Sequence, residues 1–243
     1  NSCSYSDNCI KVQEENNKKI KSIKDNMIWI STYNNLNDPF ELNAIYIDEE
    51  KLKKYGWPIS EVRTIFEKLK KSFLIGSFTI HLEDCLPMWA HYANNHEGIC
   101  VEYSVEDPSY LYKVSYENNR IAIASIIANL INEVYSEEKN KKSNIDRYLS
   151  CIINSACIKD RSWKYEDEFR ILYQNLKSKE EVSGLLVNEN DIGLKLSGVF
   201  LGINCNSEYE KELKSICRLK KCDIYKMCIE NNKEKFSLTK RLI

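Results

Sequence analysis

The sequence predicts an α+β protein with a mixed, largely antiparallel central sheet flanked by helices. One observation favours this class, and a second indicates the number of domains. Segments with strand and helix patterns are scattered along the chain without the regular strand–helix–strand alternation of a parallel sheet. In addition, no internal repeat, linker or low-complexity tract divides the chain, so we predict that residues 1–243 form a single domain.

Strands are predicted where β-branched and aromatic residues form short runs or alternate with polar residues. The clearest alternation is in YEDEFRILY, which places Glu166, Glu168 and Arg170 on one face of a strand. The predicted strands span residues 27–31, 73–80, 98–105, 111–116, 165–173, 194–203, 222–229 and 235–242.

Helices are predicted where apolar residues recur at helical spacing among charges. Ser60 is the expected N-cap of one helix, and Pro87 is expected in the first turn of another. Two of the helices would form a helical insertion near residues 120–160. The predicted helices span residues 12–24, 61–72, 86–95, about 120–137, 144–159 and 207–220.

Charge and hydropathy indicate which partners and which cellular location to expect. The net charge is −1, from 35 basic and 36 acidic residues, so nothing predicts long-range attraction to nucleic acid or an anionic membrane, although a local basic groove stays open. The given residues show no signal-peptide pattern and no apolar run long enough to span a bilayer, so we expect a cytoplasmic protein without a membrane partner. Scarce Gly and Pro with abundant Lys, Asn and Ile suggest an AT-rich bacterial genome. The chain opens at Asn1 without Met, which leaves the completeness of its N-terminus open.

Ten cysteines occur, but their spacing does not resemble a disulfide framework. No C-x-x-C pair is present, and most cysteines lie within apolar runs. We therefore expect reduced thiols packed in the core, with Cys3 and Cys9 as the most exposed.

The segment MWAHYANNHEGICVEY, residues 88–103, holds the densest cluster of candidate functional residues. His91, Tyr92 and His96 lie near one helix end that leads into a strand, and Trp89 precedes them. Histidine exchanges protons near neutral pH, so His91 is a candidate catalytic residue, and Tyr92, His96 and Trp89 are candidate binding residues. The alternative is a structural role, with His91 hydrogen-bonded in the core and His96 facing solvent.

The second candidate segment is DRSWKYEDEFRIL, residues 160–172. A strand face that carries Glu166, Glu168 and Arg170 is not expected against an apolar core, so it either faces water or lines a polar cleft. Two carboxylates on one face repel each other, and Arg170 or Arg161 could offset this. Trp163 adds an aromatic ring to the carboxylates and arginine, a combination common in binding sites.

A third segment, STYNNLNDPFEL, contains a predicted turn at Asn37-Asp38-Pro39. Asn37 and Asp38 are candidate binding residues, with a purely structural turn as the alternative, and Glu41 could reach the same cleft. The spacing of Cys85, His91, His96 and Cys100 matches no zinc pattern, so we predict no metal site. Phosphate-binding, dinucleotide-binding and serine-hydrolase motifs are also missing from the sequence.

These segments resemble the bacterial family catalogued as domain of unknown function 2971 (DUF2971). The matching pieces are IWIS…LNDPFE at 28–41, MWAHYANNHEGICVEY at 88–103, K-x-x-x-W-x-Y-E-x-E-F-R at 159–170 and FLGINC at 200–205. An aromatic-rich strand that usually precedes the first piece is only partly present around Tyr5. The resemblance implies no particular reaction.

A weaker resemblance, in an N-terminal aromatic strand, a central aromatic/His element and a late strand with E-x-E, is to ADP-ribosyltransferases. That resemblance implies NAD as a substrate, with Glu168 as the carboxylate that holds its ribose and Glu166 orienting the acceptor. His91 or Tyr92 would then bind NAD, and a fixed carboxylate would stabilise the oxocarbenium-like transition state. E-x-E alone is a common pattern.

Three functions are therefore open. The first is an enzyme directed at a nucleotide or nucleic acid, most sharply an NAD-using ADP-ribosyltransferase-like activity. The second is a non-catalytic sensor module that binds a nucleotide or a protein partner, in a setting such as bacterial phage defence. The third is a metal-dependent hydrolase or nuclease. All of them require His91 and Glu168 to share one pocket; the oligomeric state is left open.

Overall fold

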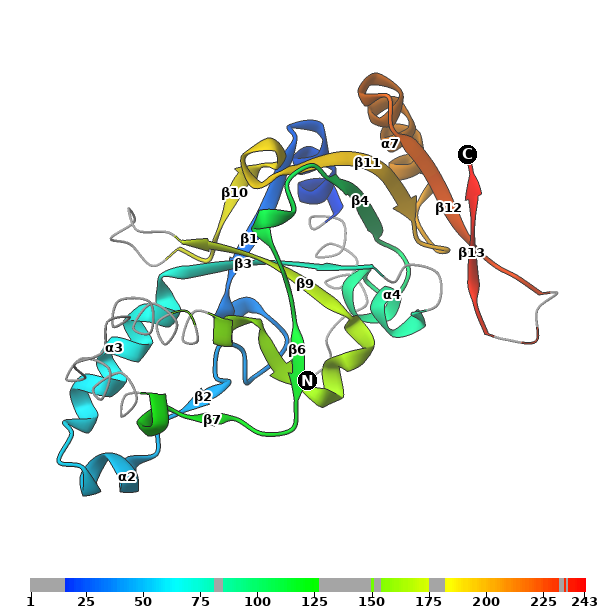
Figure 1. The fold of residues 1–243 in the computed structure, drawn as a ribbon. Coiled ribbons are helices and arrows are strands. Elements are labelled where there is room, and N and C mark those ends of the chain that lie inside the picture. The colour runs from blue at the N-terminus through cyan, green and yellow to red at the C-terminus, as the bar shows by residue number, and fades with distance from the viewer. Residues whose placement is uncertain are drawn as a thin grey trace, which may run out of the picture. The chain divides into compact units, whose positions relative to one another are not determined.

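The structure is a computed structural model that describes residues 16–80, 85–126, 150, 154–174, 182–231, 234 and 236–243. The described residues form an α+β protein with mixed, largely antiparallel strand pairing, as predicted. Helices and strands follow one another irregularly along the chain, and the strands belong to two larger sheets and two two-stranded sheets (Figure 1).

Two compact units divide the chain. The first comprises Asn1–Trp29, Thr79–Tyr110 and Leu186–Ile243, and the second comprises Ile30–Phe78 and Leu111–Leu185. Each has its own apolar clusters. Whether they behave as the predicted single domain stays a prediction.

The first unit is built on a four-stranded sheet with the order β13-β12-β11-β4. β11 pairs antiparallel with β4 and parallel with β12, and β12 pairs antiparallel with β13. Helix α7 (Ser207–Lys220) connects β11 to β12, so this parallel pair has the helical crossover that such pairs require (Figure 1). The four strands are β4 (Ile99–Val105), β11 (Leu194–Leu201), β12 (Asp223–Ile229) and β13 (Leu238–Leu242).

Alternation along β11 explains how this sheet is covered on both faces. Val199 and Leu201 pack with buried residues of α7, whereas Phe200 between them packs with Trp89 and Ala93 at helix α4 (Leu86–Tyr92). Because side chains alternate across a strand, one short apolar run supplies both cores.

The second unit contains most of a five-stranded sheet with the order β10-β1-β3-β9-β5. Its strands are β1 (Met27–Thr32), β3 (Phe73–Thr79), β5 (Leu111–Lys113), β9 (Glu168–Gln174) and β10 (Gly184–Asn188). Two short parallel pairs accompany it: β2 (Ile45–Tyr46) with β7 (Ile121–Ala122), and β6 (Ser115–Glu117) with β8 (Ile158–Asp160). Helices α2 (Glu49–Lys54) and α3 (Ile59–Lys71) contribute Leu52 and Phe66 to an apolar cluster around β2.

Several predicted elements differ from the structure in their bounds. The helix expected from Ser60 begins at Ile59, so Ser60 lies inside the first turn and is not the N-cap. The strand expected at 111–116 is interrupted at Val114, because β5 pairs with β9 whereas β6 pairs with β8. Helix α2 and strand β10 were not predicted. Most of the expected insertion near 120–160 lies outside the described residues; within it are β7, a helical stretch at 123–126, a 3-10 turn at Ser155–Cys157 and β8.

The seven described cysteines are all free thiols, four of them buried. No helix in the described part of the chain is both long and apolar enough to cross a bilayer. Cys3 and Cys9 lie outside the described residues.

Candidate functional site

The predicted site residues divide between the two units. Four of them, Trp89, His91, Tyr92 and His96, belong to the first unit, and six, Asn37, Asp38, Trp163, Glu166, Glu168 and Arg170, belong to the second. Their convergence across a shared cleft stays a prediction, and each group is described within its own unit.

In the first unit, α4 ends early and a left-handed turn follows it. The predicted helix 86–95 stops at Tyr92, since Asn94, Asn95 and His96 have φ of 49°, 50° and 67°. Successive residues with left-handed backbone dihedrals are rare for L-amino acids, although Asn and His adopt them more readily than most residues. The turn therefore places His96 independently of the helix, whereas His91 stays on the last turn of α4.

The left-handed turn at residues 94–96, called the histidine turn below, is packed backbone to backbone against the segment that follows β11. The amide of Gly202 donates to the carbonyl of Gly98 over 2.9 Å, and the amide of Asn204 donates to the carbonyl of His96 over 3.0 Å. A Cβ at Gly202 would lie 2.1 Å from the His96 carbonyl oxygen, so only glycine permits this approach.

The aromatic and histidine side chains of this segment have different surroundings. Trp89 is 3% exposed within the apolar cluster that includes Phe200 and Met227, whereas His91 and Tyr92 are exposed. Nδ1 of His96 is buried without a hydrogen-bond partner among the described residues. Of the aromatic and histidine side chains described in this segment, His91 and Tyr92 are thus the exposed ones.

In the second unit the acidic segment is not a continuous strand. Residues Arg161–Glu166 form a 3-10 helix capped by the side chain of Asp160, and Asp167 follows with φ of 40°. Strand β9 begins at Glu168, so Glu166 precedes the strand and does not share its face by alternation. The predicted strand 165–173 is therefore wrong at its start, because the cap at Asp160 begins a 3-10 helix and the left-handed Asp167 ends it immediately before the strand.

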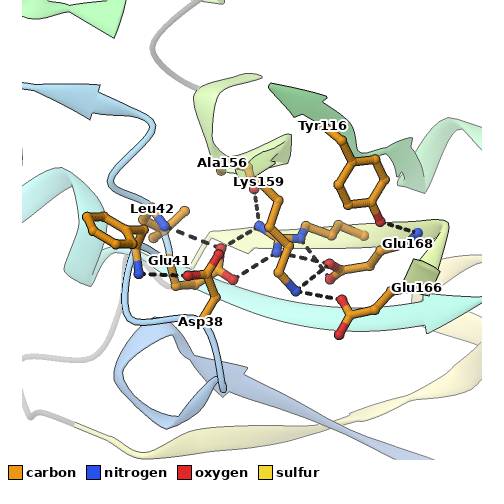
Figure 2. A network of polar contacts seen from close by, with 10 residues as sticks. Asp38, Glu41, Leu42, Tyr116, Ala156, Lys159, Glu166 and Glu168 are labelled. Atoms are coloured by element: carbon orange, nitrogen blue, oxygen red, sulfur yellow. Dashed lines mark hydrogen bonds and ion pairs between the residues drawn. The ribbon is translucent and has the colours of Figure 1, made fainter. Parts of the chain in front are cut away.

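The acidic residues and Arg170 are buried rather than facing water. Glu41, Lys159, Glu166 and Glu168 belong to one network of polar contacts (Figure 2), which together with Arg170 is called the ion cluster below. Arg170 is 0% exposed, and Glu166 and Glu168 are each 3% exposed. The expectation of either a solvated face or an open polar cleft does not describe these side chains. Burial is tolerated because opposite charges and hydrogen bonds satisfy each ion inside the unit.

Arg170 links two carboxylates from distant parts of the chain. Its Nη1 and Nη2 donate to the two oxygens of Glu41 over 2.5 and 2.8 Å, and its Nε donates to Oε1 of Glu168 over 2.8 Å. Nη2 also reaches Oε2 of Glu168 at 3.1 Å, and Nη1 donates to the carbonyl of Ala156. The planar guanidinium fork can form such paired contacts, which a lysine ammonium cannot.

Lys159 is the second cation of the cluster. Its Nζ pairs with Glu166 and Glu168 (Figure 2), over 2.7 and 3.2 Å, and its side chain is 6% exposed. The same ammonium lies 4.7 Å from the ring centroid of Trp163. Lys159 therefore joins the buried acids to Trp163 of the 3-10 helix.

The pKa values of the two carboxylates that share Arg170 are shifted in opposite directions. Burial alone would raise the pKa of Glu168, but Arg170 and then Lys159 hold it below its ordinary value. Burial raises the pKa of Glu41 above its ordinary value, because the attraction of Arg170 offsets only part of the desolvation. Burial would lower the pKa of Lys159, yet Glu168 and Glu166 raise it. Glu168 and Lys159 are thus held as an ion pair at neutral pH.

Backbone contacts fix this cluster in place. The amide of Glu168 donates to the Tyr116 hydroxyl over 2.8 Å (Figure 2), and its carbonyl accepts from the amide of Val114 over 2.9 Å. Oδ1 of buried Asp38 accepts from the amide of Phe40 over 2.8 Å, which shapes the turn that delivers Glu41. Asn37 is exposed beside this turn.

Sequence reasoning missed the role of Lys159 and understated that of Glu41. Lys159 was assigned to the end of a helix, although it stands at the first position of the K-x-x-x-W-x-Y-E-x-E-F-R pattern. Counting charges could have identified Lys159, because three buried glutamates require more than one cation. Arg161, the alternative partner considered for the carboxylates, is exposed.

Among the residues that the structure describes, no group of three or more His, Cys, Asp or Glu side chains is arranged to hold a metal ion. The metal-dependent hydrolase hypothesis stays a prediction.

Comparison with known proteins supports one of the two resemblances. Residues 88–171 match the family model described as "Protein of unknown function (DUF2971)", which confirms that resemblance for this stretch. The matched residues include the histidine turn of the first unit and the acidic segment of the second. No curated protein and no solved structure matches the chain.

Proposed function

We propose that this chain is a nucleotide-recognition module whose binding surface is the aromatic pair Trp163 and Tyr165 in the second unit. The observation that carries the proposal is that these two rings are neighbours on one 3-10 helix and that one of them contacts the buried ion cluster. The two rings lie 6.2 Å apart with an interplanar angle of 32°, and Lys159 approaches the Trp163 ring from the ion cluster.

The chemistry of this surface suits a base and its phosphate. Tyr165 is 38% exposed and Trp163 is partly exposed, so both rings can accept a stacked base. Arg161 and Lys164 flank Trp163 on the same 3-10 helix and are exposed, so they can contact a phosphate. Aromatic rings interleaved with basic residues are typical of surfaces that bind single-stranded nucleic acid and nucleotides.

The ion cluster makes this surface rigid rather than chemically reactive. Both oxygens of Glu168 already accept hydrogen bonds from Arg170, and one of them also pairs with Lys159. With 3% of its surface exposed, Glu168 offers no free oxygen to a bound ribose. This arrangement favours recognition without chemistry.

Titration calorimetry with NAD, ATP and a short single-stranded oligonucleotide tests this proposal. Trp163→Ala and Tyr165→Ala should each weaken binding by roughly 1–3 kcal/mol, the usual contribution of a base stacked on an aromatic ring. The matched control is Tyr55→Ala, because Tyr55 and Trp57 form another ring pair at 5.6 Å and 37° in the same unit. The proposal would be refuted if wild type, Trp163→Ala and Tyr165→Ala bind every nucleotide with equal affinity.

An NAD-using transferase is a second candidate, supported by the ionisation of Glu168. A carboxylate held below its ordinary pKa in a site with little water could stabilise an oxocarbenium-like transition state. For this reaction Lys159 must leave Glu168 when NAD binds. Incubation with labelled NAD, with Glu168→Gln as the variant, should then give transfer or nicotinamide release that the variant lacks. Absence of both products from wild type would eliminate this candidate without affecting the binding proposal.

A further inference from the structure

Two cysteines in the first unit meet at the end of helix α7, far along the chain from the residues discussed above. The helix ends at Lys220, and Lys221 then adopts a left-handed conformation with φ of 57°. The amide of Cys222 donates to the carbonyl of Cys217 over 3.1 Å. This is the helix-ending motif in which the residue after the left-handed position contacts the residue five places earlier.

In this motif the two contacting positions are usually both apolar, and here both are thiols. Cys217 is 1% exposed and belongs to the apolar cluster that contains Leu213 and Ile216. Cys222 is partly buried, packs against the same cluster, and shares a side-chain hydrogen bond with Cys217. Both are free thiols in this structure.

We propose that Cys217 and Cys222 are an oxidation site that forms a reversible disulfide across the end of helix α7. The pair combines a partly buried cysteine, Cys222, with a buried thiol already in contact with it. Such a pairing of an accessible cysteine with a neighbouring resolving cysteine is the arrangement found in redox-sensitive sites. The site is independent of the nucleotide-binding proposal, which involves the other unit.

The oxidant is a peroxide, and the reaction proceeds in two balanced steps. The Cys222 thiolate attacks one peroxide oxygen, the O–O bond breaks, and the other oxygen leaves as hydroxide and takes up a proton to form water. Cys222 is then a sulfenic acid. The sulfur of Cys217 next attacks Sγ of Cys222, the S–S bond forms, and the S–O bond breaks. Its hydroxide leaves and combines with the Cys217 proton as a second water.

The surroundings of the two thiols assign these roles. Burial, and then the hydrogen bond with Cys222, raises the pKa of the Cys217 thiol to about 12, although Lys220 acts in the opposite direction. Cys217 therefore stays protonated and is a poor first nucleophile. Cys222 is the more accessible of the two, so it meets the peroxide first.

Peptide mapping of the intact chain after mild hydrogen peroxide treatment tests the proposal. Free thiols are blocked by alkylation before digestion with trypsin, which cleaves after Arg218, Lys220 and Lys221. The expected product is a disulfide between the peptides Ser215–Arg218 and Cys222–Lys226, which separate on reduction. Neither peptide contains another cysteine, so the linkage is unambiguous.

Two variants control the assignment. Cys222→Ser should abolish the linked peptide pair, whereas Cys228→Ser should retain it, because Cys228 is another partly buried cysteine outside the pair. The proposal is overturned if wild type shows Cys222 linked to a different cysteine or oxidised to sulfinic acid without the link. It is equally overturned if both thiols remain alkylatable while other cysteines of the chain oxidise.

Discussion

Arg170 binds Glu41 through two parallel hydrogen bonds of 2.5 and 2.8 Å, although 129 residues separate them in the sequence. The same guanidinium holds Glu168, so one fully buried arginine connects the turn before β2 to the start of β9. Stability of the second unit should therefore depend on Arg170 more than on any exposed charge.

Arg170→Met should lower the free energy of unfolding by roughly 3–5 kcal/mol, because it leaves Glu41 and Glu168 buried without their shared cation. Urea denaturation followed by circular dichroism measures the change. Arg161→Met is the matched control and should alter stability by less than about 0.5 kcal/mol, because Arg161 is exposed. Arg170→Lys should not restore stability, since one ammonium cannot form both paired contacts. A small effect of Arg170→Met on the free energy of unfolding would show that the stability of the second unit does not depend on the ion cluster.

Glu41 and Glu168 should influence acid stability in opposite directions. The folded pKa of Glu168 lies below the ordinary value of 4.5, so its stabilising contribution is present above the unfolded pKa and is lost as the pH falls through the folded pKa. The folded pKa of Glu41 lies above 4.5, so the folded state holds that proton more tightly, and stability falls as the pH rises from 4.5 through the folded value.

Glu41→Gln should therefore remove this decline. Its unfolding free energy relative to wild type should rise as the pH increases from about 4.5, by about 1.4 kcal/mol for each unit of pKa difference. Denaturant midpoints measured from pH 4 to pH 8, in about half-unit steps, give the slope. The constant loss caused by breaking the bond to Arg170 does not affect that slope. A difference that is flat with pH would contradict the raised pKa of Glu41.

Gly202→Ala should destabilise the first unit by about 1–3 kcal/mol or more, because the new Cβ would overlap the carbonyl of His96. Backbone cannot move aside as a side chain can. Gly198→Ala is the control, because its Cβ would meet mainly the mobile carboxylate of Glu102 at 3.0 Å. Thermal unfolding compares the two variants, and similar losses would argue against the close backbone approach at His96.

Asn95→Val should lower the unfolding free energy by roughly 1–2 kcal/mol, because a β-branched residue resists the left-handed conformation that Asn95 adopts. Asn95→Gly should change it by less than about 1 kcal/mol, since glycine adopts positive φ freely. Asn95 is exposed, so lost packing does not explain a difference between the variants. Equal stability of the two would indicate that residue 95 is not left-handed in solution.

Most of the regular elements could be predicted because their signals are local. Helix α7 has the bounds expected from its periodicity, and β4, β11 and β12 follow their apolar runs closely. Errors arose where tertiary contacts or local caps override a pattern. Period-two alternation extended the strand back to Tyr165, but the cap at Asp160 and the left-handed Asp167 determine a 3-10 helix there.

The sequence by itself determined the α+β class, the reduced state expected of the described cysteines, and which segments carry unusual polar chemistry. It could do so because periodicity, spacing and composition depend on neighbours along the chain. Only the tertiary structure decided that Glu166, Glu168 and Arg170 are buried, and that Glu41 and Lys159 are their ion-pair partners. The reason is physical: an alternating charged strand is compatible with water or with a buried partner, and that partner comes from a turn and a strand that the pattern does not contain.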